Sequence, residues 1–467
     1  MKHILPLPFC VLALGLAGCV SYRPAPLDAR RALTELSARS VEVIFGADGA
    51  PPVGSFNLSD GLNERELIAV ALRLNTDLAA ARAGVGESRA ALLAAGLFPD
   101  PELGASYQPG VGDTDGFNAD IDLMFELLRF GERGAKQDAA RAAVDASTAA
   151  VAAREYDVAT EVRRQLTVVL AAEQELILLD QELALRRQSL ELIQRRREAG
   201  EANALDVAAS QLELTEIERE RRQAAARLPV ERAKLNRLLG LTPNYELRLS
   251  DSGRPLEVRL IDVPDESTIR ASVLSGRLDL VEKAADYRRA EQELRLEVIR
   301  QYPSLKIGPA FSHEGEDENF FGLGVAIDVP LLNRNRGEIA AKLAQRDRVR
   351  AEYVDRLHQM AREAAVAAAA VASMRAEVDA QRNDLLPLLE QNERLYRGAL
   401  DARELSVVDF VLLQQRTLQA RRAHLRTLTD YRTALIELDG AAGLTLTGIR
   451  PSQSTSPPLN PTKQEKP

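Results

Sequence analysis

The chain has 467 residues, with 60 lysines and arginines against 69 aspartates and glutamates and a formal net charge of −9. This acidic balance, with both signs interspersed, argues against a nucleic-acid-binding protein. Both cysteines lie within the first 19 residues and the four histidines are scattered, so the sequence offers neither a disulfide framework nor a transition-metal site. No catalytic or phosphate-binding motif is found, and we predict that the protein is not an enzyme and needs no cofactor.

The N-terminus predicts export. A short basic start precedes an apolar run from Ile4 to Ala17, and the run ends in Leu16-Ala17-Gly18-Cys19. Such a segment is too short to remain as a membrane helix and is typical of a secretory signal. Its last four residues resemble the bacterial lipobox. We therefore predict a signal peptide over residues 1–18 and a lipid anchor on Cys19, and the absence of an aspartate at position 20 favours the outer membrane. The alternative is an ordinary signal with a chance cysteine.

After an extended arm over residues 19–60, the chain contains two copies of one large unit. Leu97-Phe98-Pro99 returns as Gln301-Tyr302-Pro303, and Leu127-Leu128 returns as Leu331-Leu332, each 204 residues later. One period of this length indicates two copies of a structural unit rather than a solenoid of short repeats. We place the first copy at residues 61–248, a linker at 249–264, the second copy at 265–447, and a proline-rich disordered tail at 448–467.

Each copy contains a pair of predicted β-strands. Apolar residues alternate with polar or small ones from Phe117 to Leu127 and again from Phe321 to Val329. A period of two with one apolar face is typical of a half-buried strand. We predict β-hairpins over residues 101–127 and 303–331, and strands of about 9 to 11 residues, the length that a tilted strand needs to cross a bilayer. Aromatic residues at the helix-side strand ends suit a membrane interface: Phe98, Phe130 and Tyr302.

A long helical hairpin follows each pair of strands. In the first copy, apolar residues recur every seven positions: Val162, Val169, Leu176, Leu183 and Leu190. The second copy repeats the pattern, and its apolar seam is expected to run on through Leu388 and Leu395. Sustained heptads predict coiled-coil packing. Turns near Gly200 and between Gly398 and Glu404 return the chain, and we expect Pro387 to kink the second rod near its end.

The order of these elements resembles the TolC family of outer-membrane efflux proteins, over about residues 61–447. The matching residues are Asn75-Thr76-Asp77-Leu78, the Phe-Pro and Tyr-Pro entries to the hairpins, Gly200 with Leu205-Asp206-Val207 and Gln211, and Gln415-Arg416-Thr417-Leu418. The segment from Pro330 to Gly337 is similar to the CzcC branch of the family, which serves heavy-metal cation exporters.

The expected fold is mainly α with a membrane β part, in which long coiled-coil hairpins accompany two β-hairpins per protomer. Four strands cannot close a barrel, and an open sheet edge cannot persist in lipid, so other copies must contribute strands. The resemblance implies a homotrimer with a 12-stranded β-barrel in the outer membrane and a helical tunnel in the periplasm. It also implies three kinds of partner: a periplasmic adaptor protein, an inner-membrane pump of the RND type, and outer-membrane lipid.

Several candidate site residues follow. Asp206 and Asp409 match the aspartates with which the family closes its periplasmic entrance, although both could instead cap helices. The residues at the periplasmic turns that would contact the adaptor are Gly200, Gly398 and Leu405. By strand alternation the barrel lumen receives Asp120, Asp122, Glu126 and Asp328, and an acidic lumen favours cations. His313 is expected in a loop, and no residue is assigned to a metal or to catalysis.

We therefore expect the outer-membrane exit duct of a tripartite efflux system that passes heavy-metal cations. Outlets for multidrug efflux or for type I protein secretion stay open as alternatives. A rival from a different class is a periplasmic coiled-coil scaffold lipoprotein without a pore. The strand alternation argues against this rival, because a scaffold has no need of membrane-length strands.

Overall fold

The computed structural model describes residues 22, 24–41, 60–109, 116–315, 318–330, 332–402, 404 and 407–444. The predicted signal peptide, the anchor Cys19, the turn residue Leu405 and the tail 448–467 lie outside the described residues. The chain divides into two units, Met1–Asp48 and Gly49–Pro467. In the first unit, helix α2 (Ala29–Ser37) is capped by the Asp28 carboxylate, which accepts hydrogen bonds from the backbone N–H groups of Arg30 and Arg31.

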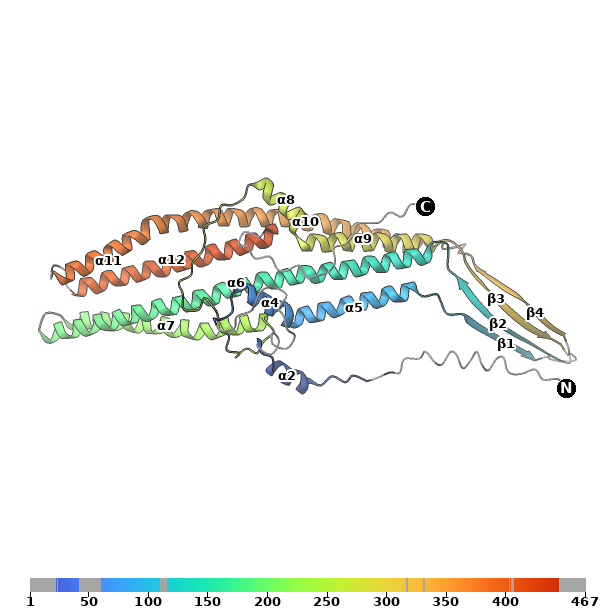
Figure 1. Ribbon diagram of the computed structural model, residues 1–467, viewed down its shortest axis with the longest axis horizontal. Coiled ribbons are helices and arrows are strands. Elements are labelled where there is room, and N and C mark those ends of the chain that lie inside the picture. The colour runs from blue at the N-terminus through green and yellow to red at the C-terminus, as the bar shows by residue number, and fades with distance from the viewer. Residues whose placement is uncertain are drawn as a thin grey trace. The chain divides into compact units, whose positions relative to one another are not determined.

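The second unit is built from long helices and one antiparallel sheet (Figure 1). Its first half contains α4 (Glu64–Leu74), α5 (Thr76–Gly96), β1 (Glu102–Pro109), β2 (Phe117–Leu127), α6 (Glu132–Glu198) and α7 (Ala204–Leu238). Its second half contains α8 (Glu266–Gly276), α9 (Leu278–Ile299), β3 (Ser304–Glu314), β4 (Glu318–Asp328), α10 (Arg336–Ala380), the π-helical turn η2 (Gln381–Leu385), α11 (Leu386–Asp401) and α12 (Val407–Ala442). The predicted mainly helical fold with two β-hairpins is confirmed.

The sheet joins the two halves of the chain. Its strand order is β1-β2-β3-β4, and all three pairings are antiparallel. The central pair, β2 with β3, places Ile121 opposite Phe311 although the two residues come from different repeats. One hairpin from each copy therefore makes half of the sheet, and β1 and β4 are its two edges.

Helix α6 runs unbroken for 67 residues. At a rise of 1.5 Å per residue it spans about 100 Å. Its predicted heptad seam is buried at Val162, Val169, Leu183 and Leu190. Near its end it packs against α7 through a cluster of apolar side chains: Leu179, Leu183, Leu190, Leu214 and Ile217. The seam thus holds the first helical hairpin together, as the period predicted.

The second rod departs from a regular α-helix before Pro387. Residues 381–385 form the π-helical turn η2, in which the Leu386 N–H bonds to the carbonyl of Gln381. A proline cannot donate to the preceding turn of an α-helix, and a π turn is a common way to absorb such a defect. The Gln381 side chain also donates to Thr427 Oγ1 at 3.1 Å and contacts His424 Nδ1 at 2.7 Å, both on α12.

The π turn changes which leucines are buried beyond it. The expectation that the seam continues through Leu388 and Leu395 is wrong, because these side chains are 52% and 58% exposed. Leu389 is buried instead. A π turn holds one residue more than the α-helical turn that it replaces, so the helix face advances by one position. The heptad count is therefore valid only up to η2.

The repeat appears in space as two equivalent junctions between helices. Asn75 caps α5, and its Nδ2 donates to the Leu238 carbonyl at the end of α7, at 2.9 Å. Arg277 precedes α9, and its Nη1 donates to the Gly440 carbonyl near the end of α12, at 2.7 Å. Both bonds span 163 residues of sequence. The same position in each copy thus satisfies carbonyl groups at the end of the returning helix.

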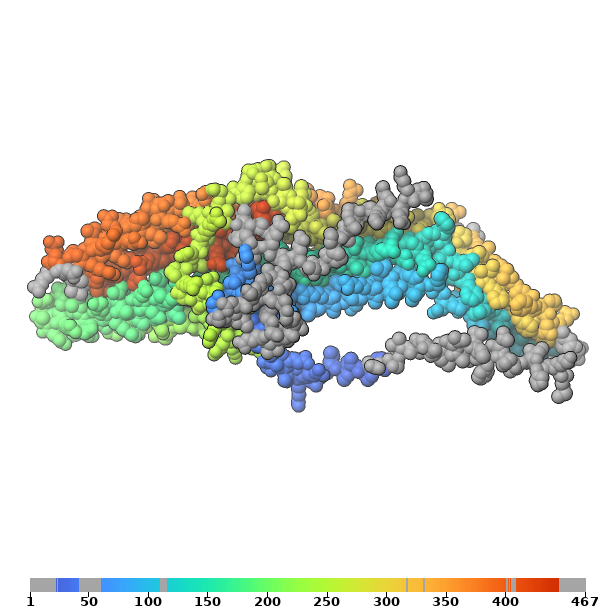
Figure 2. Space-filling view, in the orientation of Figure 1, coloured from blue at the N-terminus to red at the C-terminus, as the bar shows by residue number. Residues whose placement is uncertain are grey.

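The linker between the copies crosses the second helical hairpin, as the yellow-green segment in Figure 2 shows. The Ile261 N–H donates to the hydroxyl of buried Tyr431 at 2.9 Å. Arg375 on α10 pairs with Asp262 at 2.7 Å. These contacts fix the linker across α10 and α12, between the sheet and the far ends of the hairpins.

Candidate functional site

The sheet has one polar face and one apolar face. Because the strands pair without a bulge, residues of even number share one face and residues of odd number share the other. The even face contains the charged residues of the described strands: Glu102, Asp120, Asp122, Glu126, Lys306, Glu314, Glu318 and Asp328. The four predicted lumen residues therefore lie on one face.

The odd face is apolar and exposed. Its exposed side chains include Leu103, Tyr107, Ile121, Phe125, Phe311, Phe321, Leu323, Val325 and Ile327. Leu323 is 67% exposed and Phe321 81% exposed. An apolar surface that extends over four strands is not stable in water and requires lipid or another protein to cover it. In the described residues no helix is long and apolar enough to span a membrane.

One lysine stands among the carboxylates of the even face. Lys306 Nζ lies 2.7 and 2.6 Å from the two carboxylate oxygens of Glu102, across the sheet from β1. Its partner in the β2 register is Glu126. The carboxylates of this face outnumber its one lysine. The face therefore keeps a net negative charge and attracts cations rather than anions.

A buried charge cluster joins the sheet to the helices. Glu132, the first residue of α6, is 2% exposed and lies between Arg129 at 3.1 Å, Lys136 at 3.2 Å and Arg300 at 3.7 Å. Arg129 Nε also donates to the Tyr302 carbonyl, at 2.6 Å. This cluster connects β2, α6 and α9, so it fixes the direction in which the helices leave the sheet.

The cluster predicts a pH dependence of stability. Burial alone would raise the pKa of Glu132, but the hydrogen bond from Arg129 and the charge of Lys136 outweigh it and lower the pKa below its ordinary value of 4.5. A lowered pKa stabilises the folded state above the unfolded-state pKa, and this stability is lost as the pH falls through the folded-state pKa. At pH 7 we expect Glu132→Gln to lower the unfolding free energy by about 1–3 kcal/mol.

The measurement is thermal unfolding of the wild type and the Glu132→Gln variant from pH 7 down to pH 3. The difference between the two proteins should shrink as the pH falls below 4.5, the ordinary pKa of a glutamate, and should vanish below the lowered pKa of folded Glu132, where the wild-type carboxylate is protonated. A difference that stays constant over this range would show that the Glu132 charge contributes nothing. Glu66→Gln, at a cap remote from the sheet, is the matched control.

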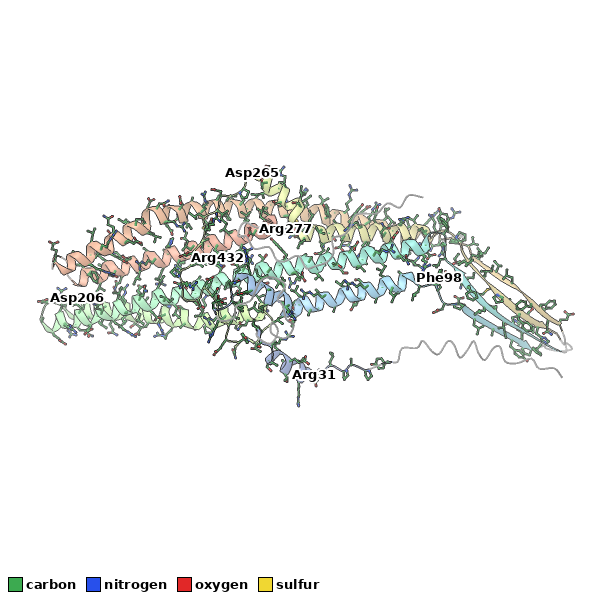
Figure 3. The ribbon with its side chains drawn as sticks, in the orientation of Figure 1. Arg31, Phe98, Asp206, Asp265, Arg277 and Arg432 are labelled. Carbon is green, nitrogen blue, oxygen red and sulfur yellow. The ribbon has the colours of Figure 1, made fainter. Side chains whose placement is uncertain are left out.

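The ends of the helical hairpins carry the predicted entrance residues. Figure 3 labels Asp206 at the end of the α6–α7 hairpin that lies away from the sheet. There the carboxylate of Asp206 accepts the Asn203 N–H at 2.9 Å, while the Asn203 side chain accepts the Asp206 N–H at 2.9 Å. This reciprocal pair is a capping box, so Asp206 has the capping role that the sequence left open as an alternative. Its exposed position leaves it accessible to ions as well.

The two turns are equivalent, but their glycines are not. Gly200 has a φ of +78° and follows α6, where the Glu201 N–H bonds to the Arg196 carbonyl at 2.8 Å. In the second copy, the Glu404 N–H bonds to the Ala399 carbonyl at 2.8 Å in the same pattern. Gly398 therefore lies within the last turn of α11 and is not the counterpart of Gly200. Asp409 is exposed in the first turn of α12.

His313 lies in β3, so the expectation of a loop position is wrong. Its ring contacts Phe117, with ring centres 4.5 Å apart, and its Nδ1 lies 3.0 Å from Asn319 Oδ1. Strand β3 extends three residues beyond Phe311, the last apolar residue of its predicted alternation. Within the described residues no cluster of histidine and acidic side chains could hold a metal ion.

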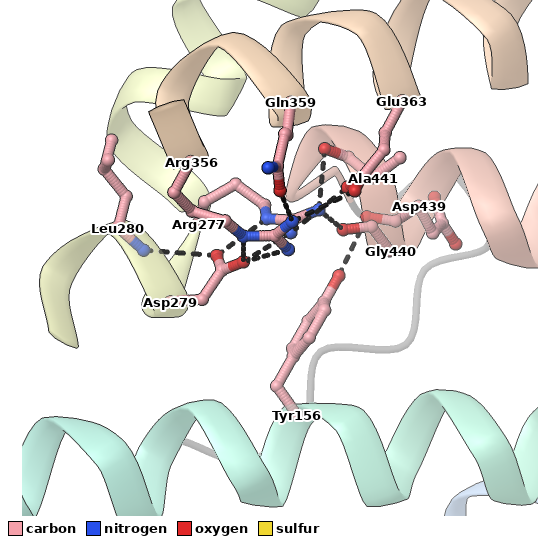
Figure 4. A network of polar contacts seen from close by, with 10 residues as sticks. All are labelled: Tyr156, Arg277, Asp279, Leu280, Arg356, Gln359, Glu363, Asp439, Gly440 and Ala441. Carbon is pink, nitrogen blue, oxygen red and sulfur yellow. Dashed lines mark hydrogen bonds and ion pairs between the residues drawn. The ribbon is translucent and has the colours of Figure 1, made fainter. Parts of the chain in front are cut away.

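Sequence reasoning missed a network at the second junction, which Figure 4 shows. Arg277 donates to the Gly440 carbonyl near the C-terminal end of α12 and pairs with Asp279 at 2.5 Å. Arg356 on α10 pairs with the same carboxylate at 2.7 Å. Burial would raise the pKa of Asp279, but the hydrogen bonds from Arg277 and Arg356 lower it. The sequence repeat could have pointed to this site, because Arg277 occupies the position in the second copy that Asn75 has in the first copy.

The same network continues into the helical core. The Tyr156 hydroxyl donates to the Asp439 carbonyl at 2.8 Å, and burial together with the Asp439 charge raises the pKa of Tyr156 to about 12. The Asp439 carboxylate accepts from Arg163 at 3.0 Å, and Arg163 reaches Glu64 on α4 at 2.7 Å. Helices α4, α6 and α12 are thus joined by ion pairs in which Arg163 and Asp439 are buried and Glu64 is partly exposed.

Comparison with known proteins finds similarity to outer-membrane efflux proteins. Residues 67–241 match the family model described as outer membrane efflux protein. The chain is similar to the cobalt-zinc-cadmium resistance protein CzcC of Cupriavidus metallidurans, at 23% identity over 377 residues that cover 80% of this chain and 88% of that protein. The pyoverdine export outer membrane protein OpmQ of Pseudomonas aeruginosa is 24% identical over 396 residues, which cover 76% and 78% of the two chains.

Solved structures share the fold of this chain. The Campylobacter jejuni CmeC outer membrane channel superposes with a TM-score of 0.68 at 16% identity, over 92% of this chain and 94% of that one. CusC, which was studied for the conformational changes that accompany folding and transmembrane channel formation, gives a TM-score of 0.64 at 18% identity, over 84% and 95% of the two chains. The chain therefore has the fold of these outer-membrane channels, as the resemblance to the TolC family implied.

Proposed function

We propose that the protein is the outer-membrane exit duct of a tripartite efflux system and that its cargo is heavy-metal cations. The observation that carries the proposal is the two-faced sheet. Its apolar odd face suits lipid and its acidic even face suits a water-filled lumen that favours cations. The similarity to CzcC, named for resistance to cobalt, zinc and cadmium, supports the metal cargo.

The channel requires more than one copy of the chain. The sheet has open edges at β1 and β4, and unpaired backbone groups at an edge cannot persist in lipid. We propose a homotrimer, in which β4 of one protomer pairs with β1 of the next and the three sheets close a 12-stranded barrel. The helical hairpins then form a tunnel that extends into the periplasm.

The hairpin ends are proposed to meet the other components. An adaptor protein would contact the turns at Gly200 and beside Gly398 and Leu405, and an RND-type pump in the inner membrane would supply the energy. The proposed anchor is a lipid on Cys19, which would hold the N-terminal arm at the outer membrane. Whole-protein mass spectrometry of the membrane-extracted chain tests this anchor, because a cleaved and acylated N-terminus differs in mass from an unmodified one.

Two measurements test the channel and its cargo. Purified oligomers in planar bilayers should conduct and should prefer cations, and a complete lack of conductance would overturn the channel assignment in favour of the scaffold. A deletion strain should become sensitive to zinc, cobalt, cadmium, copper or silver. Unchanged tolerance to these metals with raised sensitivity to organic compounds would favour the second candidate, an outlet for small organic molecules, which the similarity to OpmQ supports.

The entrance residues give a separate prediction. If Asp206 and Asp409 of three protomers surround the tunnel axis, they attract trivalent cations to its mouth. Near water each charge pair at 4 Å contributes about 1 kcal/mol, so we expect the double change Asp206→Asn with Asp409→Asn to weaken block by hexaamminecobalt(III) at least about ten-fold.

Asparagine is chosen because its side-chain oxygen can still accept the Asn203 N–H and preserve the capping box. The measurement is the concentration for half-block of single channels, with Asp384→Asn in the π turn as the matched control. Equal block in the double variant and the wild type would remove both aspartates from the entrance.

A further inference from the structure

In the described strands the even face carries two large apolar side chains, Met124 and Phe320, and only Phe320 is exposed. Phe320 lies on this face by the β3–β4 register, opposite Ser312, and is 50% exposed. The other residues of the face in β4 are charged or small: Glu318, Gly322, Gly324, Ala326 and Asp328. An exposed phenylalanine on a charged surface loses the free energy that burial would give it, about 1.5–3 kcal/mol.

Phe320 belongs to a row of side chains that crosses the whole sheet. The register aligns it with Ser312 on β3, Asp120 on β2 and Ser106 on β1. The Ser106 hydroxyl donates to the Asp120 carboxylate at 2.8 Å and so holds that carboxylate in the row. The row therefore combines one aromatic ring with one oriented negative charge.

The neighbouring row on the helix side contrasts with it. That row consists of Gly104, Asp122, Ala310 and Gly322. A Cβ atom added to Gly322 would meet no other described atom within 4 Å, so the space beside Phe320 is open. The even face thus changes from small residues to an aromatic ring within one step along the strand, two residues from the end of β4 at the β3–β4 connection.

We propose that Phe320 forms, together with Asp120, a constriction near the hairpin end of the barrel that limits the size of the passing solute and favours cations. The proposal rests on the proposed channel and names the residue that sets its selectivity. In a closed barrel, the Phe320 side chains of the protomers project into one cross-section and narrow it. The ring faces attract cations, while Asp120 supplies the full negative charge.

Single-channel recording with the full-length protein tests the constriction. We expect Phe320→Ala to raise the conductance roughly two-fold and to admit larger organic cations, because the ring is removed from the narrowest section. Phe321→Ala is the matched control, since Phe321 lies on the opposite, apolar face. Its conductance should equal that of the wild type.

Thiol modification gives an independent readout. The natural cysteines both lie within the first 19 residues, far in sequence from the strands. A charged, membrane-impermeant methanethiosulfonate reagent added to the bath should reduce the current of Phe320→Cys channels and leave Phe321→Cys and wild-type channels unchanged.

The outcomes separate this proposal from the channel assignment. If the wild type conducts but Phe320→Ala leaves conductance and solute cut-off unaltered, the constriction is refuted and the channel stands. Reaction at Phe321→Cys rather than Phe320→Cys would also refute it. If the wild type itself does not conduct, the proposed function fails.

Discussion

Placing an arginine at Leu323 should prevent assembly in the outer membrane. Leu323 lies in the middle of β4 on the apolar face and is 67% exposed in the isolated chain. An arginine on the lipid-facing surface of a barrel costs about 2–4 kcal/mol near the bilayer midplane. A closed assembly carries the cost once in every protomer, so we expect little or no oligomer in the outer-membrane fraction of cells that produce Leu323→Arg.

The adjacent residue is the control. Gly322 lies on the polar face, where an added side chain meets open space. Gly322→Arg should therefore assemble normally, while its positive charge reduces the preference for cations in bilayer recordings. The measurements are the amount of oligomer after membrane fractionation and the reversal potential in a salt gradient. If Gly322→Arg blocks assembly and Leu323→Arg does not, the two faces have been assigned the wrong way round.

The largest loss of stability should come from the buried carboxylate of Asp439. This side chain is 1% exposed and pairs with Arg163, which is 5% exposed. Removing one partner of a buried ion pair costs about 3–5 kcal/mol, because the other charge remains without compensation. Arg163 keeps its contact with Glu64. We therefore expect Asp439→Ala to lower the unfolding free energy by about 3 kcal/mol, the lower end of that range.

Glu437 provides the comparison on the same helix. Its side chain is 50% exposed and lies 3.8 Å from Arg164, so Glu437→Ala should cost less than about 1 kcal/mol. Denaturant unfolding of the purified protein in detergent, followed by helical circular dichroism, gives both values. Equal losses for the two variants would mean that the buried network contributes no more than a surface pair.

The periodic elements could be predicted from the sequence because their signal is local. Period-two alternation located β2 and β4, and the seven-residue period located the α6 seam at Val162 and Val169. The same alternation predicted that Asp120, Asp122, Glu126 and Asp328 share one face. Pro387 indicated a break near the end of the second rod, and the structure places η2 directly before it.

Contacts between distant parts of the chain could not be predicted in this way. The bonds from Asn75 and Arg277 each cross 163 residues, and the Arg163–Asp439 pair crosses 276. No period links such positions. The pattern of the repeat could have indicated that Asn75 and Arg277 are equivalent, but not that each reaches a helix end. The place of Phe320 on the polar face was missed for another reason. It directly precedes Phe321, and two adjacent phenylalanines hide the alternation of apolar and polar residues at the start of β4.

The π turn η2 changes which side of the second rod each later residue occupies. One extra residue turns an α-helix by about 100° around its axis, since a full turn takes 3.6 residues. Everything beyond η2 is therefore rotated relative to the part before it, and Leu388 and Leu395 point out of the protomer while Leu389 packs inside. The first rod contains no π turn between the two ends of α6. Two hairpins that share an ancestry thus present different surfaces at their far ends, and any ring of alternating hairpins built from them has two kinds of seam.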